Sequence, residues 1–184
     1  MFNFYNIVAY QIVWFACVLG AAQDVAWLGT VVALCALAAH LWFIEDRHAE
    51  LTLMAAAAVV GLIVDTALIR WHVISFNAGL LSAGFPPHWM LSLWLVFATT
   101  LNHSLRWLAR RPALAAICGG IGGPLAYYGG MRLGALQIQL TPAALLTIGA
   151  AWALAMAALA LLASLPDLLH WNKRCARSSS YLPQ

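Results

Sequence analysis

The chain has 184 residues, of which 64% are apolar and 8% are charged, and its net charge is +3. Soluble globular proteins are about 45–50% apolar and about 25% charged, so nine basic and six acidic side chains are too few to cover a water-exposed surface. This composition excludes a soluble domain and a disordered chain, gives no sign of nucleic-acid binding, and indicates an integral membrane protein.

Six apolar segments follow one another along the chain. A membrane-spanning helix needs about 20 apolar residues, and backbone groups in lipid must form hydrogen bonds within their own helix. The segments that approach this length are residues 4–22, 25–44, 51–70, 89–108, 113–133 and 142–165. We therefore expect an all-α bundle of about six transmembrane helices. It forms a single domain over residues 1–170, followed by a basic, serine-rich cytoplasmic tail over residues 171–184.

The positions of lysine and arginine indicate the orientation of the bundle, because these residues are concentrated in cytoplasmic loops. With the N-terminus in the cytoplasm, only Arg70 and Arg132 lie on the opposite side. The other basic residues lie on the cytoplasmic side: Arg47, Arg106, Arg110, Arg111, Lys173, Arg174 and Arg177. We therefore expect both termini in the cytoplasm.

Polar side chains gather near the cytoplasmic ends of the expected helices. The first segment has a polar stripe formed by Asn3, Asn6, Tyr10 and Gln11. His40 and His103 lie at a similar depth in the second and fourth segments; Asn102 precedes His103, and Arg106 follows one helical turn later. Three interpretations remain open: interhelical hydrogen bonds, general acid–base chemistry at His103, and joint ligation of haem or a metal by the two histidines.

Asp65 is the acidic residue that lies well inside an expected span, in the sequence GLIVDTALIR. Ionisable groups inside a membrane are paired or functional. A structural ion pair with Arg70 or Arg132 is one interpretation, and an ionisable group in a polar pocket is the other. The candidate partners at a similar depth are Tyr127, Tyr128, Arg132, His88 and His72. Asp65 and the pair of His40 and His103 thus form two polar layers at different depths.

Two connections between the expected helices have unusual sequences. Residues 71–88 are long and fairly apolar, which indicates a partly embedded or re-entrant segment on the outer side. Residues 134–141, GALQIQLT, alternate apolar and polar side chains, which is typical of a short extended or interfacial piece.

The fifth segment is rich in glycine. Gly119 and Gly123 form a GxxxG motif, which allows close approach of a neighbouring helix. This face could pack within the bundle, against a membrane-enzyme partner, or in a homo-oligomer. We expect Pro124 to kink or break the helix, because proline removes one backbone hydrogen bond.

Four stretches of the chain resemble a family of small bacterial inner-membrane proteins catalogued as a domain of unknown function. They are YQIVWFACVLGAA, GLIVDT, PPHWMLSLWLVFATTLNHSLRWL and GGIGGPLAYYGGMRLGA. The resemblance covers about residues 4–165. It implies a multi-pass protein of the bacterial inner membrane and a connection with lipid chemistry. The residues that match the family motifs are Trp14, Asp65, Pro87, Trp89, Trp94, Asn102, His103, Gly123, Pro124 and Tyr127.

These observations favour a protein of lipid metabolism that binds or modifies an acyl or isoprenoid chain inside the bundle. His103, Asp65 and Asn102 are the candidate catalytic residues, and the candidate substrate-binding residues are Arg70, Tyr127, Trp94, His40 and Arg106. We expect membrane lipids as partners and neither a metal nor another cofactor, with haem ligated by His40 and His103 as the alternative. The alternative functions are a small transporter with Asp65 as its coupling site and a non-catalytic partner of a membrane enzyme.

Overall fold

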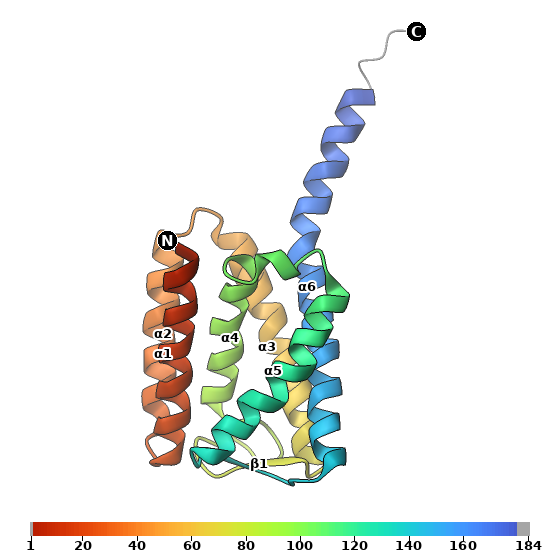
Figure 1. Cartoon of the computed structure of the whole chain (residues 1–184). Helices are drawn as coiled ribbons and strands as arrows, with labels where there is room; N and C mark the ends of the chain where they lie inside the picture. The colour runs from red at the N-terminus through yellow and green to blue at the C-terminus, as the bar shows by residue number, and fades with distance from the viewer. Residues whose placement is uncertain (1, 180–184) are drawn as a thin grey trace.

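The computed structural model describes residues 2–179, with side chains over residues 3–165. Its helices run alternately up and down in one bundle, and the N-terminus lies at the same end as the segment between α4 and α5 (Figure 1). The α-helices are α1 Phe2–Ala22, α2 Ala26–Phe43, α3 Arg47–Arg70, α4 His88–Asn102, α5 Pro112–Arg132 and α6 Pro142–Ser179. A short 3-10 helix, Arg106–Leu108, joins α4 to α5. The expected all-α class is confirmed.

Within the part of the chain that the structure describes, four helices are long and apolar enough to cross a membrane: Asn3–Ala22, Ala26–Phe43, Arg47–Arg70 and Pro142–Leu165. Large apolar side chains cover the outside of the bundle, among them Leu34, Ile63, Ile121 and Leu154. An exposed apolar surface of this kind is suited to contact with lipid. The fold is therefore that of a helical membrane protein, while the count of six spans and the orientation remain predictions.

The helix α4 forms the centre of the bundle and is shorter than the sequence predicts. Most of its side chains are buried, and Trp89, Trp94 and Leu101 are almost inaccessible. The predicted end of this helix near residue 108 is wrong because the chain leaves the helix at His103. There, the carbonyl oxygen of Thr100 accepts hydrogen bonds from the backbone N–H groups of His103 (3.2 Å) and Leu105 (2.6 Å). With its fifteen residues, α4 is about 22 Å long.

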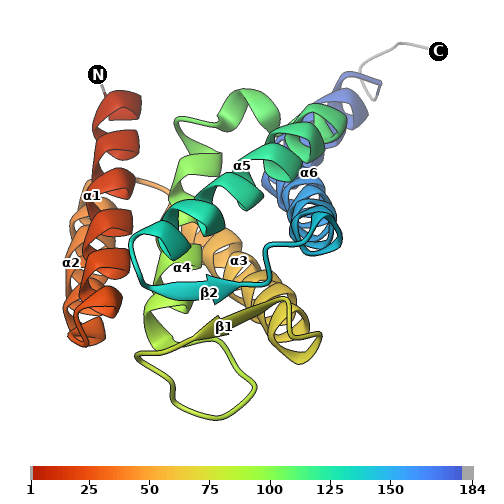
Figure 2. The same ribbon diagram turned by 60° about the horizontal axis from the view of Figure 1, so that its bottom comes forward.

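A two-stranded antiparallel ladder closes the other end of the bundle (Figure 2). Strand β1, Ile74–Phe76, pairs with β2, Leu136–Ile138, so that Ser75 faces Gln137. The prediction of an extended piece within residues 134–141 is confirmed. Residues 71–88 contribute β1 and then fold under the bundle, where the carbonyl of Ala78 accepts a hydrogen bond from the Trp89 indole at 3.1 Å.

The glycines of α5 are used for packing inside the chain. A Cβ atom at Gly119 or at Gly123 would lie under 3.0 Å from atoms of Met156 and Trp152 on α6. Close helix contact through the GxxxG motif is therefore found between α5 and α6 of the same chain. The helix is continuous through Pro124, so the expected break is not found, while a kink at this residue stays a prediction. Neighbouring helices allow transmembrane helices to tolerate the lost hydrogen bond.

The last helix also extends beyond its predicted end. The sequence predicts that it stops near Leu165, before Pro166, whereas α6 continues to Ser179.

Candidate functional site

Glu50 is the centre of a polar cluster that the sequence did not reveal. The predicted third span began at residue 51, but α3 begins at Arg47 and places Glu50 in its first turn, where it is 4% exposed. Asp46 caps this helix by accepting a hydrogen bond from the N–H of Ala49 at 3.1 Å. Arg47 donates to the carbonyl of Leu41 at 2.9 Å, which fixes the start of α3 against the end of α2.

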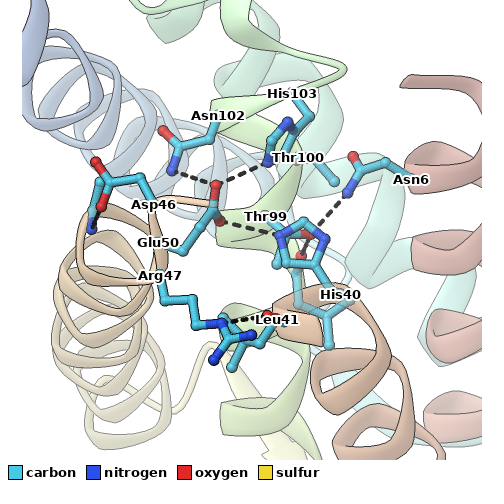
Figure 3. Close-up of polar contacts among 12 residues, drawn as sticks. Asn6, His40, Leu41, Asp46, Arg47, Glu50, Thr99, Thr100, Asn102 and His103 are labelled. Carbon is cyan, nitrogen blue, oxygen red and sulfur yellow. Dashed lines mark hydrogen bonds and ion pairs between the residues drawn. The ribbon is translucent and has the colours of Figure 1, made fainter. Parts of the chain in front are cut away.

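Two histidines from different helices converge on the Glu50 carboxylate (Figure 3). Nε2 of His40, on α2, lies 3.2 Å from Oε2, and Nε2 of His103, at the end of α4, lies 2.8 Å from Oε1. Asn102 donates its amide N–H to Oε1 at 3.1 Å. We call His40, Glu50, Asn102 and His103 the Glu50 cluster. The prediction that His40 and His103 lie at the same depth is confirmed, since their ring centroids are 5.1 Å apart.

The burial of the Glu50 cluster determines what it can do chemically. The side chains of His40 and Glu50 are 9% and 5% exposed, and that of His103 is 20% exposed. A buried carboxylate is stable only when it is hydrogen-bonded or paired with positive charge. With two imidazoles on one carboxylate, the cluster can hold a proton or a cation. Asp46 is the sequence signal that could have revealed it, because a helix cap at that position places Glu50 within the helix.

Asn6 connects the polar stripe of α1 to the same end of α4. Its amide donates to the hydroxyl of Thr99 at 3.0 Å, and its carbonyl oxygen accepts a hydrogen bond from Ser104. Asn6 is 7% exposed. The stripe therefore faces protein at this position, as predicted, and positions α1 beside the segment that carries His103.

A second polar cluster surrounds Asp65 in the half of the bundle that is closer to the ladder. The carboxylate is fully buried and accepts hydrogen bonds from the Trp94 indole at 2.9 Å and from the Tyr127 hydroxyl. Gly61 lies one turn before Asp65 and leaves space for the indole ring. Within the described residues neither Arg70 nor Arg132 forms an ion pair with Asp65, so that predicted pairing is wrong.

The predicted site residues are thus divided between two separate clusters. Glu50 and Asp65 are fifteen residues apart on α3, which corresponds to about 22 Å along the helix. Arg70 lies with its guanidinium 5.9 Å from the ring centre of Phe85. Arg106 is exposed and lies at the start of the 3-10 helix. It is not part of α4, which ends at Asn102. The two polar layers predicted from the sequence are present, but they do not form one catalytic site.

A groove lies between α1 and α5, with α4 and α6 behind it. Its volume is about 440 Å³. Aromatic side chains and the glycines of α5 form much of its wall, including Tyr10, Trp14, Phe97, Trp107, Gly122 and Trp152. A narrower space of about 40 Å³ shares Tyr10, Trp14, Phe97 and Trp152 with the groove and is also lined by Trp94 and Tyr127. The groove therefore leads toward the Asp65 cluster.

Comparisons with known proteins identify the family but no function. No curated protein and no solved structure matches the chain. One family model matches residues 3–158, a range that contains the Glu50 cluster, the Asp65 cluster and the residues of the groove. The chain belongs to this family, which is described as a protein of unknown function (DUF2878).

Proposed function

We propose that this membrane protein binds the acyl or isoprenoid chain of a lipid in the groove between α1 and α5. The groove itself is the observation that carries the proposal. Its volume of about 440 Å³ lies within the range of about 300–1,000 Å³ that is usual for small-molecule sites. Its wall is mostly aromatic and aliphatic, which matches an apolar chain rather than a sugar or a nucleotide.

The position of the groove supports entry from the membrane. Gly122, Leu125 and Trp107 line it and are exposed on the outside of the bundle, and Leu125 is 65% exposed. A Cβ atom at Gly122 would meet no other atom within 4 Å. The absence of a side chain there keeps the groove open toward the space that lipid would occupy.

The Asp65 cluster supports the inner end of the groove in this proposal. Its three hydrogen-bonded residues come from α3, α4 and α5 and hold these helices together. Trp94 and Tyr127 line the narrow space, and both therefore contact the end of a bound chain. The six-span arrangement in the bacterial inner membrane, with both termini in the cytoplasm, belongs to the same proposal.

The test fills the groove with one added side chain. Gly122→Leu places a leucine in the open space, while Ala113→Leu adds the same side chain at an exposed position of the same helix. The protein is purified in mild detergent, and the lipids that remain bound are identified by native mass spectrometry. We expect a defined lipid on the wild type and on Ala113→Leu. Gly122→Leu should retain roughly tenfold less, which corresponds to about 1.4 kcal/mol of binding free energy.

Two results would contradict the proposal. One is a wild-type protein that carries no lipid beyond the mixture found on any detergent-solubilised membrane protein. The other is equal retention of the same lipid by Gly122→Leu and Ala113→Leu, which would place the lipid outside the groove.

A further inference from the structure

We propose that His40, Glu50 and His103 form a binding site for a divalent transition-metal ion. One ligand atom from each residue, two imidazole nitrogens and a carboxylate oxygen, lie within 4.8 Å of one another. The three residues come from the ends of α2 and α4 and the start of α3, so the fold itself brings them together (Figure 3).

The types of ligand define the class of metal. Two histidines and one carboxylate form the ligand set of many catalytic zinc sites and of non-haem iron(II) sites. Magnesium and calcium prefer sites made of oxygen ligands alone. The cluster therefore matches a zinc- or iron-type ion.

The present distances are close to those that a metal site requires. Ligand atoms about 2.0–2.2 Å from a zinc ion lie roughly 3–4 Å from one another. Nε2 of His40 and Nε2 of His103 are 3.2 and 2.8 Å from the Glu50 oxygens. Small rotations of the side chains open enough space for the ion. Binding replaces the two His–Glu hydrogen bonds with metal–ligand bonds. For this, Nε2 of each neutral imidazole must carry the lone pair, so the ring proton moves by exchange with water to Nδ1.

Asn102 fits the role of a residue that orients a ligand without touching the metal. Its amide donates to Oε1 of Glu50 at 3.1 Å. Hydrogen bonds of this kind fix ligating carboxylates, and their loss weakens metal binding about 10–100-fold.

Three protein ligands leave at least one coordination position for water or another molecule. His40 also lines a cavity of about 180 Å³ between α1 and α2, together with Asn6 and Thr99. A small molecule can therefore approach the cluster from this side. The cavity does not include the α5 and α6 residues that line the proposed lipid groove. The metal site and the lipid site can thus be tested independently.

The experiment uses the full chain in detergent, stripped of metal, with Zn²⁺ and Co²⁺ as probes. Zinc stoichiometry is measured by elemental analysis after gel filtration, and Co²⁺ is followed by its visible absorption. The ligand variants are Glu50→Gln and His103→Gln. The matched controls are Glu45→Gln and His48→Gln, which change exposed residues of the same types close by in the chain. Asn102→Ala tests the orienting hydrogen bond.

We expect about one Zn²⁺ per wild-type chain and a tetrahedral or five-coordinate Co²⁺ spectrum. Both ligand variants should lose stoichiometric binding, both controls should retain it, and Asn102→Ala should bind about 10–100-fold more weakly. X-ray absorption at the zinc edge of the wild type should show two imidazole ligands, which requires no variant to fold. Absence of stoichiometric binding by the wild type, or unchanged binding by folded Glu50→Gln, would overturn the proposal. The cluster would then be a hydrogen-bonded contact between helices.

Discussion

Gly61, the single glycine of α3, is predicted not to tolerate a side chain. Its missing side chain is what allows the Trp94 indole to lie flat against the helix one turn before Asp65. A Cβ atom at this position would lie under 3.0 Å from several atoms of the indole ring. Because Trp94 is 2% exposed and stacks on Trp152 with ring centroids 4.6 Å apart, the indole has little room to move away.

The expected effect of Gly61→Ala follows from these contacts. Overpacking of a core typically destabilises a protein by about 1–3 kcal/mol. Displacing the indole also weakens its 2.9 Å hydrogen bond to the buried Asp65 carboxylate, which adds about 1–3 kcal/mol. The higher helix propensity of alanine offsets up to about 1 kcal/mol. Together these contributions give an expected net loss of about 1–6 kcal/mol in the free energy of unfolding.

The measurement is an unfolding titration in mixed micelles with increasing sodium dodecyl sulfate, followed by far-ultraviolet circular dichroism. Gly122→Ala is the matched control, because its Cβ atom meets nothing within 4 Å; it should be neutral or slightly stabilising. A double-mutant cycle with Trp94→Leu identifies the mechanism, since contacting residues show coupling energies of about 0.5–3 kcal/mol. Equal stability of Gly61→Ala and the wild type, or strict additivity with Trp94→Leu, would refute the reasoning.

Three further predictions address the Asp65 cluster, the attachment of α1 and the topology. Tyr127→Phe leaves one oxygen of the buried Asp65 carboxylate without its donor and should reduce the free energy of unfolding by about 1–3 kcal/mol. Tyr128→Phe, at an exposed position, should have little effect. Equal melting temperatures of the two variants would contradict this prediction. Asn6→Ala removes two hydrogen bonds to the end of α4 and should lower stability by about 1 kcal/mol, with the exposed Asn3→Ala as its control in the same titration. A reporter enzyme that works only outside the cytoplasm should be active when it is inserted within residues 77–84. Activity at the same position of a reporter that works only in the cytoplasm would exclude the proposed orientation.

The helical class and the two polar layers could be predicted because both depend on local sequence. A long apolar segment in lipid must be helical, because its backbone groups form hydrogen bonds within the segment. The depth of a polar residue then follows from its distance to the end of the segment. His40 and His103 therefore lie at one level, as predicted, with centroids 5.1 Å apart. Alternating polarity in residues 134–141 likewise predicted the extended segment that contains β2.

The partners of the polar residues could not be predicted, because they depend on how the helices pack. Asp65 has an arginine five residues away in sequence, yet its hydrogen bonds come from Trp94 and Tyr127 on other helices. The sequence predicts that the third span begins at residue 51, because hydropathy alone places the start of the span after Glu50. The helix cap at Asp46 moves that boundary by one turn, and this turn changes Glu50 from a residue before the span into the centre of a buried cluster.

The ladder between β1 and β2 makes the two walls of the groove differ in how they are attached to the bundle. Its paired strands tie the chain after α3 to the chain after α5, and the glycines of α5 hold that helix against α6. The hairpin of α1 and α2 is linked to α4 by side-chain hydrogen bonds, from Asn6 to Thr99 and between Thr30 and His88 at 2.7 Å. A chain in the groove would therefore lie between two walls that are attached differently: the α5–α6 wall by the ladder and close helix packing, and the α1–α2 wall by side-chain hydrogen bonds to α4.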